Sequence, residues 1–171
     1  MRSLVFALLF CAAVNLPGKE GPWKTERFGT FGPMVSMPSD LRPDPNNGQG
    51  ESRHSFTFRT ADGAFSVTVQ NFIHVPYSAR VPDTLLALLR EDRTTYRGGI
   101  TFQRRHGRGY TVVARQKDLK VFVQKFGRRP DSNGMALRGL EIEFPIARRA
   151  EFDPWMERIA ASYRPFVEMD R

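Results

Sequence analysis

The sequence predicts a single α+β domain in which an antiparallel β-sheet carries helices on its faces. Several segments alternate strictly between apolar and polar residues, which is the two-residue period of half-buried strands. Two further segments repeat apolar residues at helical spacing. The order is a hairpin, a helix, a four-strand meander and a second helix, which is typical of an α+β fold. The length of 171 residues indicates one domain.

The most regular pattern is a hairpin formed by two segments, His54–Thr60 and Phe65–Ile73. Between them, Asp62-Gly63 predicts a type I′ turn, because this pair readily adopts positive φ angles. Residues that alternate toward one side of the hairpin should face the core, namely Phe56, Phe58, Phe65, Val67 and Val69.

The first helix should begin at Pro82-Asp83, with Asp83 as the capping residue. Its apolar stripe is Leu85, Leu88 and Leu89. Gly98-Gly99 should end it, because glycine permits a left-handed C-cap.

The second helix should begin at Asp153-Pro154, a capping residue followed by proline at the first helical position. Its apolar residues Trp155, Ile159 and Tyr163 recur every four positions. We expect this helix to pack across the sheet and close the core.

The stretch Tyr96–Phe126 is expected to form the centre of the sheet. The predicted meander has four strands, with a polar loop at residues 127–134 before the last of them: Ile100–Arg105, Tyr110–Gln116, Leu119–Phe126 and Leu140–Phe144. Adjacent apolar pairs such as Val112-Val113 predict that the middle strands are covered on both faces.

The N-terminal residues 1–13 have the layout of a secretory signal peptide. Arg2 is followed by an apolar run, Leu4–Phe10, and by small residues suited to cleavage after Ala13. The run is shorter than the roughly 20 apolar residues that span a bilayer. A buried N-terminal helix is the less favoured alternative, because no polar face alternates with the apolar residues.

The only cysteine, Cys11, lies in a sequence that loosely resembles a bacterial lipoprotein signal. Phe10 stands where such a signal has a small residue, so simple cleavage is favoured over lipidation. We therefore expect a periplasmic or secreted protein without disulfides. Residues 14–27 should be a tether, 28–166 the domain and 167–171 a tail. Within the domain, short extended pieces at 28–31 and 34–37 should precede a mobile loop at 38–50.

Three segments carry a resemblance to a known family. They are the hairpin strand FSVTVQNF, the meander GITFQRRHGRGYTVVARQKDLKVFVQKF and the closing segment LEIEFPIARRAEFDPWMERIAASYRPF. Together with the order of elements, they resemble small exported bacterial proteins with a PsbP/DcrB-like domain, over about residues 28–166. The resemblance implies an α/β/α sandwich, and no catalytic residue or cofactor is carried over with it. The metal-associated role of photosystem subunits does not follow from a shared fold.

Positive charge is concentrated in one part of the chain. Residues 97–149 contain thirteen Lys and Arg against four acidic residues, whereas the remainder has thirteen basic and fourteen acidic ones. The candidate anion-binding residues lie at predicted turns or strand ends: Arg104, Arg105, Arg108, Arg128 and Arg129. The alternative is that these arginines only solvate the surface and protect strand edges, since arginine outnumbers lysine 21 to 5 throughout the chain.

Other chemistry has little support in the sequence. The histidines, His54, His74 and His106, have no partner at metal-ligand spacing. Glu141 and Glu143 could be paired carboxylates, but an exposed strand face explains them equally well and is the preferred interpretation. Neither a nucleophile elbow nor a nucleotide-binding loop is present, so no nucleotide cofactor is expected.

These observations favour an exported, non-enzymatic binding or assembly-accessory domain of the bacterial cell envelope. An electrostatic binder of anionic envelope polymers or lipid headgroups, with peripheral membrane contact, is the alternative. An enzyme with an unrecognised site is the second alternative. The expected partner is an envelope protein or an anionic polymer; export disfavours nucleic acid, and the oligomeric state stays open.

Overall fold

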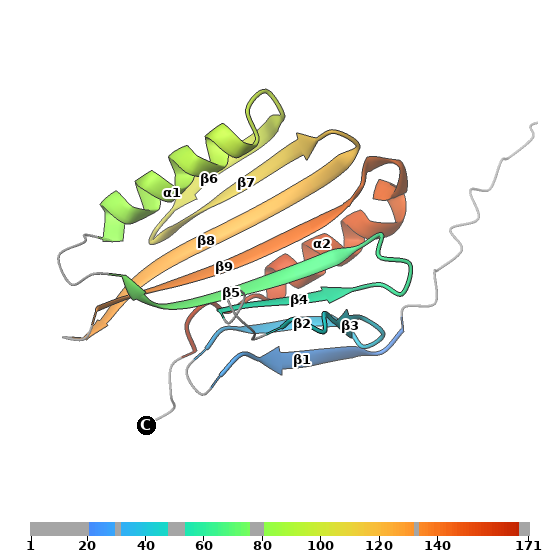
Figure 1. The fold of residues 1–171 in the computed structure, drawn as a ribbon, viewed down its shortest axis with the longest axis horizontal. Coiled ribbons are helices and arrows are strands. Elements are labelled where there is room, and N and C mark those ends of the chain that lie inside the picture. The colour runs from blue at the N-terminus through green and yellow to red at the C-terminus, as the bar shows by residue number, and fades with distance from the viewer. Residues whose placement is uncertain (1–20, 30–31, 48–53, 76–80, 132–133, 168–171) are drawn as a thin grey trace, which may run out of the picture.

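The fold is built on an antiparallel sheet of seven strands, beside a smaller sheet of two strands (Figure 1). The computed structural model describes residues 21–29, 32–47, 54–75, 81–131 and 134–167. The elements in chain order are β1 Trp23–Arg27, β2 Met34–Pro38, β3 Arg42–Pro43, β4 Ser55–Arg59, β5 Ser66–Val75, α1 Val81–Thr95, β6 Ile100–His106, β7 Gly109–Gln116, β8 Leu119–Asp131, β9 Gly134–Pro145, the 3-10 turn η2 Ile146–Arg148, and α2 Arg149–Ser162.

The large sheet has the strand order β3-β4-β5-β9-β8-β7-β6, and its neighbouring strands pair antiparallel. The predicted α+β class, hairpin and meander are confirmed. The stretch Tyr96–Phe126 is not at the centre, however. The last strand, β9, is inserted between the hairpin and the rest of the meander, which moves β6 to the edge of the sheet.

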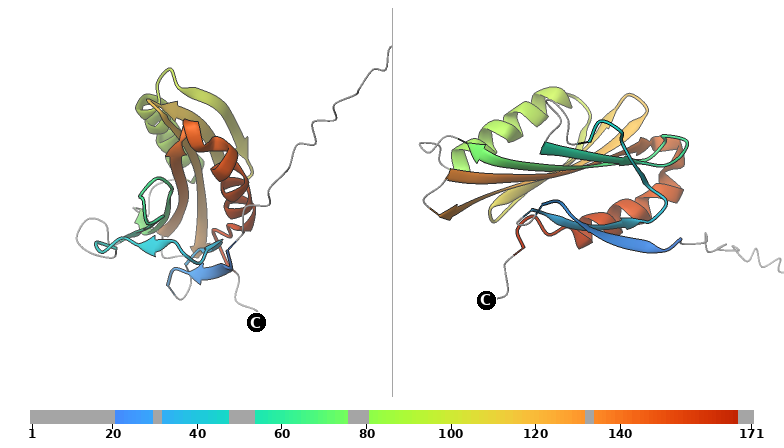
Figure 2. Two further views of the ribbon diagram at one scale, coloured as in Figure 1. Left: turned by 90° about the vertical axis from the view of Figure 1, so that its right-hand side faces the viewer. Right: turned by 60° about the horizontal axis from the view of Figure 1, so that its bottom comes forward.

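The two helices cover opposite faces of the large sheet, as the α/β/α expectation requires (Figure 2). Helix α1 contacts β7 and β8, whereas α2 contacts β9 and the small-sheet strand β2. The core is therefore divided in two. Under α1 the buried residues include Leu85, Leu89, Tyr110, Val112, Val121 and Val123. Under α2 they include Phe65, Val67, Leu140, Ile142, Phe152 and Ile159.

The β4–β5 hairpin keeps its predicted alternation, because Phe65, Val67 and Val69 are fully buried. Its turn differs from the prediction. Among the turn residues only Gly63 has a positive φ, at 69°, whereas a type I′ turn needs two such residues. Asp62 instead accepts hydrogen bonds from the Thr60 hydroxyl and the Ala64 amide, which stabilises the connection formed by residues 60–65.

The predicted loop at residues 127–134 is mostly strand, since β8 extends to Asp131 and β9 begins at Gly134. The polar and turn-forming residues in this segment predicted a loop, although most of the segment is strand. Gly127 is needed for packing rather than for a turn. A Cβ atom at this position would lie 2.8 Å from a methyl carbon of Val81, so only glycine lets α1 approach β8 this closely.

Both helices begin earlier than their capping signals indicate. Helix α1 starts at Val81, which places Asp83 inside the first turn. Helix α2 starts at Arg149, so Asp153 is not its cap and Pro154 lies within the helix. Asp153 forms an ion pair with Lys120 at 2.7 Å instead. The earlier start brings Phe152 into the helix, where its ring is completely buried in the core.

The N-terminal part of the fold is more ordered than predicted. Strand β1 occupies residues 23–27 of the expected tether, and β3 with the buried Leu41 lies within the expected loop at 38–50. The predicted signal peptide and the residues 48–53 and 168–171 lie outside the described part of the structure. Within that part, no helix is both long and apolar enough to cross a membrane.

Candidate anion-binding site at the β6–β7 hairpin

The β6–β7 hairpin carries positive charge that the fold does not neutralise. From Arg97 to Lys117 the chain has six basic residues and no acidic one. Within the described residues, none of these six side chains forms an ion pair or a hydrogen bond. Several basic side chains elsewhere do have acidic partners, for example Lys120 with Asp153 and Lys125 with Asp92. The hairpin is therefore the part of the described surface best suited to attract an anion.

The strand register separates the predicted arginines. In β6, Arg104 pairs with Thr111 and Arg105 with Tyr110, so these consecutive arginines project from opposite faces of the sheet. Arg108 lies in the turn between β6 and β7. Arg128 is half-buried, with its guanidinium 6.0 Å from the centre of the Phe166 ring. The side chain of Arg129 lies outside the described part. Of the five, the structure brings together Arg105 and Arg108.

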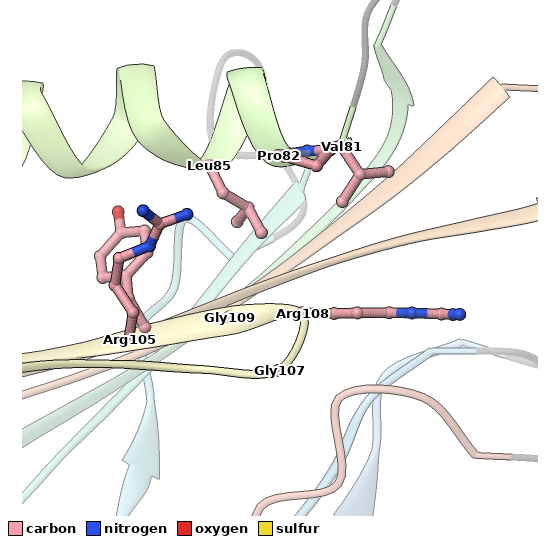
Figure 3. Close-up of a pocket in the computed structure, with 8 residues that line it drawn as sticks. Val81, Pro82, Leu85, Arg105, Gly107, Arg108 and Gly109 are labelled. Atoms are coloured by element: carbon pink, nitrogen blue, oxygen red, sulfur yellow. The ribbon is translucent and has the colours of Figure 1, made fainter.

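These two arginines line a cavity of about 310 Å³ between the first turn of α1 and the β6–β7 turn. Its lining consists of Val81, Pro82, Leu85, Arg105, Gly107, Arg108, Gly109 and Tyr110. Figure 3 shows the Arg105 side chain running from β6 toward α1, whereas Arg108 extends away from the turn. The cavity thus combines an apolar wall from α1 with one guanidinium group directed into the gap.

Two glycines hold the hairpin turn close to β8. A Cβ atom at Gly109 would lie 2.5 Å from the ring of Phe126, so no larger residue fits there without movement. Gly107 has a φ of 49°, which other residues adopt at a cost. The Gly127 amide donates a hydrogen bond to the Arg108 carbonyl at 2.9 Å. These contacts hold the β6–β7 turn, which lines one side of the cavity, against β8.

A buried acid of α1 is hydrogen-bonded through both of its carboxylate oxygens. Asp92 of α1 accepts a hydrogen bond from the Tyr110 hydroxyl at 2.6 Å and one from the Lys125 ammonium at 2.7 Å. Burial, reinforced by the hydrogen bond to Asp92, raises the pKa of Tyr110 well above its usual value. Asp92 was not among the functional residues predicted from the sequence. Its position could have indicated a buried acid, because Asp92 lies three residues after Leu89 and so falls on the apolar stripe of α1.

The pair of glutamates in β9 is half-buried rather than exposed. Glu141 and Glu143 lie on the α1 side of the sheet, opposite Val123 and Val121. Burial raises the pKa of Glu141, and the charge of Glu143 raises it further. Within the described residues, no three His, Cys, Asp or Glu side chains are grouped to hold a metal ion.

The histidine positions add no further site. The His106 ring lies 2.9 Å from the Thr111 hydroxyl and packs against Phe126, which is a structural role in the hairpin. His54 comes directly before β4, and the side chain of His74 lies outside the described part.

No family model and no curated protein matches this sequence. Among solved structures, the chain is similar to the cyanobacterial PsbP protein CyanoP from Synechocystis sp. PCC 6803, with a TM-score of 0.57 and 12% identity over 93% of this chain and 99% of CyanoP. This similarity confirms the PsbP-like fold and, at that identity, shows the fold alone.

Two further solved structures are more distant. The Ran-binding protein Mog1p of Saccharomyces cerevisiae has a TM-score of 0.49 and 10% identity, over 86% of this chain and 100% of Mog1p. LpqN, involved in cell envelope biogenesis of Mycobacterium tuberculosis, has a TM-score of 0.48 and 9% identity, over 85% of this chain and 91% of LpqN.

Proposed function

We propose that this protein is an exported, non-enzymatic accessory domain of the bacterial cell envelope that binds an anionic partner through its β6–β7 hairpin. The observation that carries the proposal is the run from Arg97 to Lys117. It has six basic side chains without acidic partners, and it lies at an open sheet edge beside a cavity. The layout of residues 1–13 supports export.

The groups that line the cavity suit binding better than proton transfer. Guanidinium groups keep their proton at physiological pH, so Arg105 and Arg108 can hold a negative charge but cannot act as a base. The Tyr110 hydroxyl donates to Asp92, and its raised pKa keeps it protonated. The remaining lining is apolar side chain or glycine backbone.

The alternative function is electrostatic binding of anionic envelope polymers or lipid headgroups without a specific pocket. The opposite orientation of Arg104 and Arg105 favours it, because positive charge then projects from both faces of the hairpin. Purely electrostatic binding weakens steeply with added salt, whereas a partner that also makes apolar and hydrogen-bonded contacts is retained.

The decisive comparison uses two charge-reversal variants with equal changes of net charge. The hairpin variant combines R104E, R105E and R108E. The control variant reverses three exposed arginines outside the hairpin, R42E, R149E and R164E. Retention on heparin and on vesicles with anionic lipid should fall much further in the hairpin variant. Equal losses in both variants would contradict a binding role for the hairpin.

Repeating the retention in high salt, together with capture from an envelope fraction, separates the two functions. A partner that is lost from the hairpin variant but retained by the wild-type protein in high salt supports the accessory function. Binding that disappears in salt for every variant supports the electrostatic alternative.

Export is tested on the mature N-terminus. Mass spectrometry of the protein recovered from a bacterial envelope should show a chain that begins at Val14. A diacylated Cys11 would contradict simple cleavage and assign lipoprotein anchoring instead.

A further inference from the structure

The cavity beside Arg105 has an apolar wall and a cationic rim. Val81, Pro82 and Leu85 of α1 supply its apolar side chains, and Leu85 is also part of the core under α1. Arg105 alone directs a guanidinium group toward this wall, as Figure 3 shows. A ligand that matches this lining has an apolar body and a negatively charged head.

We propose that this cavity binds a small amphiphilic anion, a single short alkyl or aryl group that carries one phosphate or carboxylate. The inference rests on the proposed function, because it assigns a ligand class to the same hairpin. It goes beyond the proposed function because it assigns a defined ligand to the cavity at Arg105, in addition to the non-specific attraction by the positively charged surface.

The size of the cavity limits the apolar part of the ligand. Its volume of about 310 Å³ lies at the lower end of the roughly 300 to 1,000 Å³ found for small-molecule sites. It can take one short chain or one ring. Each methylene group that leaves water should tighten binding roughly fourfold.

The charge of Arg105 determines the head group. Its side chain has no acidic partner among the described residues. The nearby Asp92 carboxylate accepts hydrogen bonds from Tyr110 and Lys125 instead. A guanidinium group binds a phosphate or carboxylate through two parallel hydrogen bonds. Arg108 extends away from the turn, so its contribution is a weaker, longer-range attraction.

The experiment is calorimetric titration of the protein with octyl phosphate below its micelle concentration. Separate titrations use octanoate, butyl phosphate, inorganic phosphate and octanol. Octyl phosphate should bind more than about tenfold tighter than butyl phosphate and far tighter than inorganic phosphate, because the chain is buried in the cavity. Octanol should bind weakly, since it lacks the charge. The octanoate titration decides between a phosphate and a carboxylate head.

Adjacent residues of β6 provide matched variants. R105A should weaken octyl phosphate binding roughly 10- to 100-fold, because it removes a charge-assisted hydrogen-bonding group. R104A removes the same charge from the opposite face and should change binding less than about twofold. R105K keeps the charge but loses the paired geometry and should lie between them. Thermal melts of each variant establish that the fold is retained.

The outcomes separate this inference from the proposed function. Equal weakening by R104A and R105A, or equal affinity for butyl and octyl phosphate, would overturn the shaped site while leaving hairpin binding to heparin intact. Failure of both amphiphiles to bind, with normal heparin retention, overturns the ligand class alone. Loss of heparin retention by the control variant as much as by the hairpin variant overturns the proposed function itself.

Discussion

Arg148 and Arg105 occupy comparable positions at the ends of secondary-structure elements, yet their surroundings are opposite. Arg148 donates hydrogen bonds to Asp62 at 2.6 Å and to Glu151 at 2.7 and 2.8 Å, and its guanidinium lies 4.4 Å from the centre of the Phe152 ring. Arg105 has no such partner among the described residues. One arginine joins the β4–β5 turn to α2, and the other faces a cavity.

The difference shows that residue type alone does not reveal the role of an arginine. On the α2 side, Arg148 and Lys120 have acidic partners, and a dense aromatic cluster packs beneath the helix. On the β6–β7 side, charge is left without partners at the edge of the sheet. We infer that the first region stabilises the fold and the second is available for binding.

The largest expected effect is in the aromatic core under α2. Phe152 is fully buried, with ring centres of Phe65 and Trp155 at 5.0 and 5.5 Å. Phe152→Ala should reduce the free energy of unfolding by about 3–5 kcal/mol, measured by urea denaturation. Phe102→Ala is the matched control, because Phe102 is 49% exposed on β6, and it should cost about 0.5 kcal/mol. Similar costs at both sites would contradict the division into a stabilising and a binding region.

The next largest effect concerns the ion pair under α1. The side chains of Lys125 and Asp92 are 17% and 10% exposed. Lys125→Met leaves the buried Asp92 carboxylate without its counter-charge and should cost about 2–3 kcal/mol, below the cost for a fully buried pair. The double variant D92N/K125M should recover part of this loss in the same denaturation experiment. No recovery would indicate that Lys125 acts through packing alone.

A smaller effect is expected for the partners of Arg148, which are exposed to solvent. Hydrogen bonds from Thr60, Ala64 and Arg148 hold the pKa of Asp62 well below its usual value. The corresponding stability is present above the unfolded-state pKa of about 4 and is lost as the pH falls below it. Arg148→Ala should therefore lower Tm at pH 7 by less than Lys125→Met does, and the difference from wild type should narrow below about pH 4. A difference that widens in acid would contradict this linkage.

The smallest effect on stability is expected at the hairpin itself. Arg105→Ala removes a side chain without an acidic partner, so Tm should remain close to the wild-type value, or rise slightly at low salt as repulsion decreases. Differential scanning calorimetry at two salt concentrations measures this. A loss of stability comparable to that of Lys125→Met would show that Arg105 has a structural role.

Alternation and helical spacing predicted much of the fold because the order of apolar and polar residues along the chain indicates which side chains are buried. The inward residues of the hairpin and of β9 are buried as expected, among them Val67, Leu140 and Ile142. Capping and turn signals were less reliable. Asp153-Pro154 indicated a helix start, but the helix begins at Arg149 and includes the buried Phe152. The turn-rich residues after Gly127 extend two strands.

The candidate site was predictable only as a region. The excess of arginine over acidic residues marked the hairpin, yet the register of β6 against β7 decides that Arg105 faces the cavity and that Arg104 does not. Contacts between segments that are distant in the sequence decide the partners of the other charged and polar side chains near the site. The centre of the Phe166 ring lies 6.0 Å from the Arg128 guanidinium, and the Asp92 carboxylate accepts hydrogen bonds from Tyr110 and Lys125.

The sequence by itself determined the α+β class, the faces of the regular strands and helices, and the location of the positive charge, because these are local properties of residue order. Tertiary structure alone decided that β9 lies between β5 and β8, that β6 forms an edge, and which arginines remain without acidic partners. The physical reason is that pairing between distant segments sets the neighbours of a side chain, and those neighbours determine whether a charge stabilises the fold or is left for a ligand.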